Sequence, residues 1–85
     1  MILLDRVNQR TNHLLGTNLR KIRKANKLRN RDVVAKLQLM GVNVNSAILS
    51  KVECGTNNPS VDMLIALTKI YKCDFNAFFE YDEEK

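Results

Sequence analysis

Basic side chains that could hold a polyanion are gathered in one short stretch of the chain. The 85-residue sequence carries a formal net charge of +5, and eight of its lysines and arginines fall between Arg20 and Lys36. Asp32 is the only acid in that stretch, whereas residues 80–85 hold four acids and one lysine. Concentrated positive charge attracts the phosphates of nucleic acid or an anionic membrane surface, so we expect a partner of this kind.

Side chains able to do covalent or metal chemistry are few and scattered. His13 is the only histidine, and no pattern of serine, cysteine or carboxylate around it indicates a catalytic triad. Cys54 and Cys73 are too few for a disulfide framework and lack the spacing of metal ligands. We interpret them as packing residues, with redox sensing as the alternative. We therefore expect a binding protein that is not an enzyme and has no cofactor or metal.

The length and composition indicate one globular domain inside the cell. A chain of this size folds around a single core. The opening apolar run, residues 1–4, is too short for a secretion signal, and no run approaches the ~20 apolar residues of a membrane span. We therefore expect a cytoplasmic protein with reduced thiols.

The spacing of apolar residues predicts an all-α fold of five short helices. One proline and three glycines provide too few turns for many short strands. The first three expected helices cover residues 18–25, residues 30 to 39 or 40, and residues 46–54. A fourth helix carries Val61, Leu64, Ile65, Leu67 and Ile70, and a last short helix carries Phe75, Phe78 and Phe79. Residues 1–15 would form an arm or an extra helix, 16–80 the main domain and 81–85 an acidic tail.

Polar residues and glycines mark the ends of these helices. Asn30, Asn45 and Ser60 are placed to cap the second, third and fourth helices. Gly41 and Gly55 follow the second and third helices, and we expect them to end those helices in the left-handed conformation. The helices should therefore be short and separated by tight connections.

The middle of the chain resembles a known family of DNA-binding proteins. Ser50-Lys51-Val52-Glu53-Cys54-Gly55, then Asn58-Pro59-Ser60 and a leucine-rich stretch, is similar to the third helix, polar loop and fourth helix of the phage repressor/Cro-type (XRE-type) helix-turn-helix family. The resemblance covers residues 16–79, and its motifs occur in the order that the family shows.

The resemblance implies a lambda-repressor-like domain whose second and third helices form the helix-turn-helix. The third would be the recognition helix and lie in the major groove of double-stranded DNA. The implied function is sequence-specific, repressor-like regulation of transcription. Because one recognition helix covers few bases, two copies would act together as a homodimer.

The resemblance also implies roles for individual side chains. Bases would be read by Asn43, Asn45, Ser46, Ala47 and Lys51. DNA phosphates would be held by Asn30, Arg31, Thr56, Asn57 and Asn58. Arg23 in the first helix and Glu53 in the third would form a structural ion pair that holds those two helices together.

Two features depart from the family pattern. The connection from Gln38 to Val44 is longer than the usual turn between the second and third helices. Ser46 and Ala47 begin the recognition helix where relatives often carry arginine or glutamine, and such small side chains cannot make bidentate contacts with bases. The shape of the DNA would then contribute to recognition.

Two other functions stay open. The small residues at the start of the third helix are also compatible with a protein-interaction module, such as an antitoxin or an adaptor, that keeps the fold. The basic stretch could instead lie on anionic lipid as an amphipathic helix. Binding assays with duplex DNA and with liposomes would separate these hypotheses.

Overall fold

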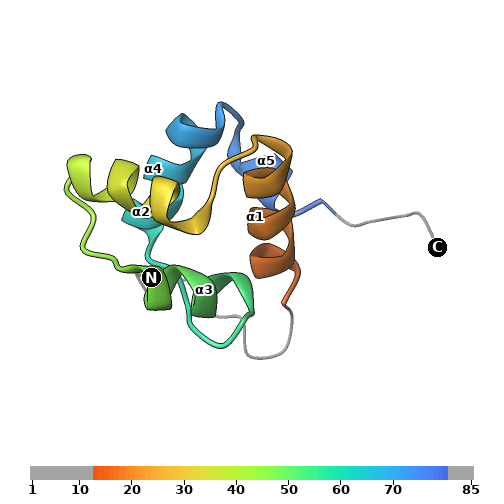
Figure 1. Ribbon diagram of the computed structural model, residues 1–85. Helices are drawn as coiled ribbons and strands as arrows, with labels where there is room; N and C mark the ends of the chain where they lie inside the picture. The colour runs from red at the N-terminus through yellow and green to blue at the C-terminus, as the bar shows by residue number, and fades with distance from the viewer. Residues whose placement is uncertain (1–12, 81–85) are drawn as a thin grey trace, which may run out of the picture.

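The computed structural model describes residues 13–80, which fold into five α-helices (Figure 1). They are α1 (Leu14–Ala25), α2 (Asn30–Leu39), α3 (Ser46–Glu53), α4 (Val61–Tyr71) and α5 (Phe75–Phe78). The expected all-α class is confirmed for this part of the chain. The predictions made for residues 1–12 and for the acidic tail, 81–85, lie outside the described residues.

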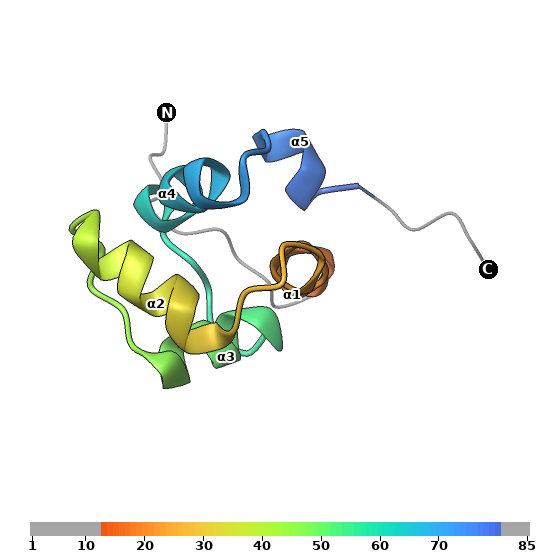
Figure 2. The ribbon, with the colours of Figure 1, turned by 45° about the horizontal axis from the view of Figure 1, so that its top comes forward.

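The helices pack in a closed ring around one core. Each helix contacts mainly two others, in the order α1, α3, α2, α4, α5 and back to α1. Figure 2 shows the ring with α1 seen end-on. Every helix contributes at least one fully buried apolar side chain to its centre: Leu19, Val33, Leu37, Leu49, Val52, Leu67 and Phe78. The ring places α2 between α3 and α4, so that α2 supports both.

α1 begins earlier than the sequence indicated. It starts at Leu14 instead of residue 18, because Leu15 and Leu19 extend the buried stripe by one turn. Their burial outweighs the cost of about 1 kcal/mol that Gly16 imposes in a helix interior. The boundary expected between an arm and the main domain therefore falls inside a continuous helix.

A buried asparagine fastens the end of the described chain to α1. The Nδ2 group of Asn18 donates to the carbonyl of Phe78 at 2.9 Å and to that of Glu80 at 2.8 Å. Both contacts join residues about sixty positions apart in the sequence. The short helix α5 is held in place by them and by the burial of Phe78.

α2 has the predicted extent, but Arg29, and not Asn30, occupies its N-cap. Asn30 is the first helical residue. The carboxylate of Asp32 accepts hydrogen bonds from the backbone N–H of Arg29 at 2.9 Å and from its Nε at 3.1 Å. These bonds close the first turn and lower the pKa of the Asp32 carboxyl below its ordinary value.

Gly41 and Gly55 end α2 and α3 in the left-handed conformation, as predicted, with φ of +86° and +82°. After α3 the backbone N–H of Thr56 returns to the carbonyl of Lys51 at 2.9 Å, which is the hydrogen bond of a Schellman motif. At Gly55 a side chain is excluded for a second reason, since a Cβ there would lie 2.6 Å from Cγ of His13.

α4 is capped as predicted, and the apolar residues expected along it are only partly buried. The Ser60 hydroxyl oxygen accepts from the backbone N–H of Met63 at 3.1 Å. Leu64 and Leu67 are buried, whereas Val61 and Ile65 are 38% and 40% exposed. Because most residues of α4 are apolar, their spacing did not distinguish the two faces.

Candidate nucleic-acid interface

α3 is seated on α1 and α2 by its apolar side. Leu49 and Val52 are fully buried, and Ile48 is half-buried. The Oδ1 atom of Asn45 caps the helix by accepting from the backbone N–H of Ile48 at 2.8 Å. The helix ends at Glu53, one residue before the predicted end at Cys54. This seating turns the opposite side of α3 outward.

The outward side of α3 carries the side chains that were expected to read bases. Asn45, Ser46, Ala47 and Lys51 are all exposed, and so is Asn43 in the connection before the helix. Lys51 is the only charged residue among them. Figure 1 shows α3 at the edge of the ring, below α1 and α2.

Asn30 joins the start of α2 to α3. Its Nδ2 group donates to the carbonyl of Ser46 at 3.2 Å and to Oγ of Ser50 at 3.1 Å. Because both protons of the Asn30 amide are used, this side chain fixes the contact between α2 and α3. The neighbouring Arg31 is exposed. Sequence reasoning did not single out Ser50. Its position one turn after Ser46 is the signal that could have found it.

The Arg23–Glu53 ion pair that the resemblance implied is present between α1 and α3. The Nε atom of Arg23 donates to Oε2 of Glu53 at 2.7 Å, and Nη2 donates to Oε1 at 3.0 Å. The two side chains are 12% and 5% exposed. The hydrogen bond to Glu53 raises the pKa of Arg23. This bidentate ion pair holds α3 against α1 in one orientation.

Tyr71, at the end of α4, extends the cluster around this ion pair to a third helix. Its side chain is 4% exposed, and its hydroxyl has no hydrogen-bond partner among the described residues. Burial, together with the negative charge of Glu53, raises the pKa of Tyr71 well above its ordinary value. No motif in the sequence marks this residue, because its neighbours in the cluster come from other helices.

The loop after α3 folds back onto the end of that helix. The hydroxyl of Thr56 donates to the carbonyl of Lys51 at 3.2 Å, and the threonine is exposed. Asn57 and Asn58 are half-buried, and together with Asn43 they help to line a pocket of about 260 Å³. Of the residues predicted to hold phosphates, the structure thus brings Thr56 and Asn57 against the backbone of Lys51.

Positive charge dominates the part of the chain that builds this surface. Residues 13–60 include nine lysines and arginines. The acids in the same range are Asp32 and Glu53, and each forms an ion pair, with Arg29 and Arg23 respectively. Because basic residues outnumber acids by nine to two in this range, the surface around α2 and α3 has a positive potential.

The remaining reactive groups are distributed over the fold. Within residues 13–80, no group of three or more His, Cys, Asp and Glu is placed to hold a metal ion. Both cysteines are free thiols, and burial raises the pKa of Cys73. None of the described helices has the length and apolar character needed to cross a bilayer.

Comparisons of the chain with models of protein families, with curated proteins and with solved structures found no match. What the site does is therefore inferred from its own residues and geometry.

Proposed function

We propose that the protein is a lambda-repressor-like helix-turn-helix regulator of transcription that binds double-stranded DNA with α3 in the major groove. The observation that carries this proposal is the orientation of α3. Its apolar residues Leu49 and Val52 face the core, and its polar side is exposed from Ser46 to Lys51. A helix held firmly in this way fits a major groove about 12 Å wide.

The groups around α3 suit the phosphates of a duplex. Arg31 is exposed in the first turn of α2, where the helix dipole also favours an anion. Asn30 brings this turn against Ser46 and Ser50, and Thr56 is exposed close to Lys51. Phosphates held near the start and near the end of α3 would set its position along the groove.

Base reading by this interface would be modest. Because Oδ1 of Asn45 caps α3, its Nδ2 group remains to donate to a base, and Lys51 supplies a second donor. Ala47 is suited to the methyl group of thymine. Few direct contacts favour a homodimer that reads two half-sites, with DNA shape adding to the specificity.

Selection of bound sequences from random duplexes, followed by titrations of the best duplex, tests this function. The dissociation constant should rise steeply with salt, because phosphate contacts release counterions. Arg31→Ala should weaken all duplexes alike, whereas Lys51→Ala should change the preferred bases. Lys69→Ala, which removes an exposed lysine from α4, is the control and should bind as the unmodified protein does. Absent or salt-independent binding would refute the proposal.

A protein-interaction module is the second candidate function. It is favoured by the small, uncharged side chains of Ser46 and Ala47 and by the use of the Asn30 amide inside the fold. A failed DNA selection, together with a co-purifying protein that Lys51→Ala releases, would favour this candidate over a regulator.

A further inference from the structure

A groove between the ends of α2 and α4 lies apart from the proposed DNA interface. We name it the α2–α4 groove. It has a volume of about 370 Å³ and is lined by Lys36, Leu39, Met40, Lys69, Ile70 and Lys72. None of these residues belongs to the groups assigned to DNA bases or phosphates.

Three of the residues that line the α2–α4 groove, Leu39, Met40 and Ile70, are apolar. Leu39 is 88% exposed, the highest value among the exposed large apolar side chains of the described residues, and Met40 is 43% exposed. The core contacts of α2 are made by residues up to Leu37, which is fully buried, so Leu39 does not serve the core. Covering such a side chain with another apolar group is favourable.

The other three residues that line the groove are positively charged. They are Lys36, Lys69 and Lys72, and no acid lines the groove. Lys36 and Lys69 lie in the last turns of their helices, where the helix dipole favours cations. Lys72 is the C-cap of α4, where the dipole also favours a cation, and its φ of +57° costs a residue other than glycine roughly 1–2 kcal/mol.

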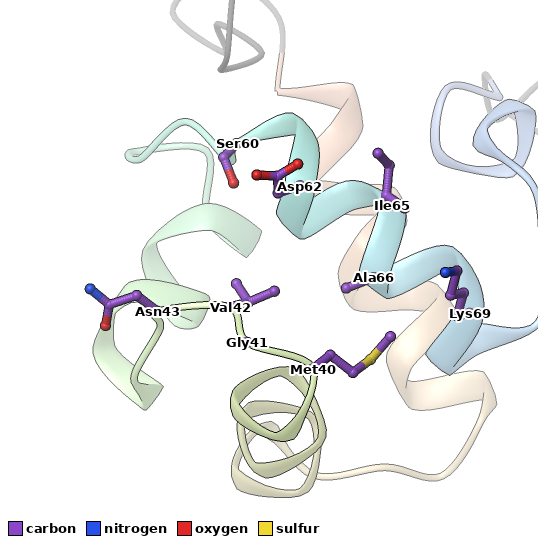
Figure 3. Close-up of a pocket in the computed structure, with 9 residues that line it drawn as sticks. All are labelled: Met40, Gly41, Val42, Asn43, Ser60, Asp62, Ile65, Ala66 and Lys69. Atoms are coloured by element: carbon purple, nitrogen blue, oxygen red, sulfur yellow. The ribbon is translucent and has the colours of Figure 1, made fainter.

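The open surface continues beyond the groove. A neighbouring pocket of about 480 Å³ shares Met40 and Lys69 with it and reaches Ile65 and Asp62. Figure 3 shows Met40 extending from the end of α2 toward Lys69 on α4. The two hollows thus adjoin at Met40 and Lys69.

We infer that the α2–α4 groove binds an acidic peptide segment of a partner protein. Large apolar side chains of the peptide would cover Leu39 and Ile70, and its carboxylates would face the three lysines. Nucleic acid would satisfy the lysines but leave Leu39 uncovered. A second copy docked groove against groove would bring lysines against lysines, which is costly.

The test uses the full chain labelled with ¹⁵N and the synthetic peptide Asp-Leu-Leu-Asp-Glu-Phe-Leu-Glu, with Asn and Gln replacing the acids in a control peptide. The acidic peptide should shift the amides of residues 36–40 and 69–73. Leu39→Ser should weaken binding about tenfold or more, because an apolar anchor is lost.

Two lysines with the same backbone conformation give a matched pair of variants. Lys72→Gly and Lys27→Gly each remove a positive charge and relieve a left-handed φ, of +57° and +59°, so both should fold at least as well as the parent. Lys72→Gly should weaken peptide binding about threefold, and Lys27→Gly should leave it nearly unchanged.

Several results would overturn the inference, and none of them bears on whether α3 binds DNA. Equal weakening by the two glycine variants would show attraction to net charge alone. Unshifted groove amides would show that the peptide does not bind there. Shifts of the same amides with protein concentration, lost in Leu39→Ser, would identify a self-association surface. Displacement of the peptide by a short duplex that shifts these amides would assign the groove to nucleic acid.

Discussion

The part of the molecule built by α1, α2 and α3 differs from the part built by α4 and α5 in what it exposes. Residues 13–60 hold nine basic side chains and two acids, both of them ion-paired, whereas residues 61–80 hold two basic side chains and three acids. Of the exposed large apolar side chains of the described residues, Val61, Ile65, Phe75 and Phe79 lie on or next to α4 and α5, and Leu39 and Met40 lie at the end of α2. Basic side chains are thus concentrated in one part, and most exposed apolar ones lie in the other.

The two parts also differ in how they are held together. α3 is fixed to α1 by the buried pair of Arg23 and Glu53 in addition to apolar packing. α4 contributes Met63 and Leu67 to the core, and α5 contributes Phe78. We conclude that apolar packing holds both parts, and that a buried ion pair is added only where α3 meets α1, among the described residues.

The largest change in the free energy of unfolding is expected when the buried carboxylate of Glu53 is removed. Glu53→Ala leaves Arg23 nearly buried without its partner and should lower the free energy of unfolding by roughly 3–5 kcal/mol. Asp62→Ala, which removes an exposed acid at the start of α4, should cost less than about 1 kcal/mol. Urea denaturation of both variants measures the difference. Similar losses would show that the ion pair has no special part in seating α3.

The two left-handed glycines offer a sharper comparison within the basic part. Gly41→Ala should cost roughly 1–2 kcal/mol, because strain is added but the space around a Cβ is open. Gly55→Ala should cost more, because the new Cβ would also meet the His13 ring at 2.6 Å. Thermal or urea unfolding of the two variants gives the order. A smaller loss at Gly55 would contradict the packing of His13 against the end of α3.

Tyr71 links the two parts, and its effect should appear only at high pH. The unfolded phenol ionises near pH 10, while burial keeps the folded phenol neutral to higher pH. Its contribution to stability is therefore full below about pH 10 and falls as the pH rises above that value. Tyr71→Phe should change stability at neutral pH by less than about 1 kcal/mol, since no hydrogen bond to the described residues is lost.

The pH dependence of unfolding distinguishes the unmodified protein from Tyr71→Phe. Measured by urea denaturation between pH 7 and 11, the unmodified protein should lose more stability than Tyr71→Phe. Parallel curves would show that the hydroxyl is accessible to water and does not lie in the cluster with Arg23 and Glu53.

Features set by neighbouring residues were predictable from the sequence. Asn45, Ser60, Gly41 and Gly55 act where they were expected, because caps and left-handed turns depend on a few consecutive residues. The pairing of Arg23 with Glu53 spans thirty positions and came from the resemblance alone.

Features set by tertiary contacts were predicted less well. The start of α1 was missed because Gly16 weakened the helical pattern, although the burial of Leu15 decided the outcome. The exposed face of α4 was missed because its apolar residues surround the helix. The link from Asn30 to Ser50 joins two helices, and the spacing of Ser46 and Ser50 indicates a shared face of α3 but not the partner on α2.

The most direct test of DNA binding by α3 is to map the duplex onto the protein by amide chemical shifts, using the sequence recovered by selection. If α3 enters the groove, the largest changes occur at Arg31 and along the exposed side of α3, from Ser46 to Lys51, with α5 unaffected. Changes confined to α4 and α5, with α3 unmoved, would contradict it.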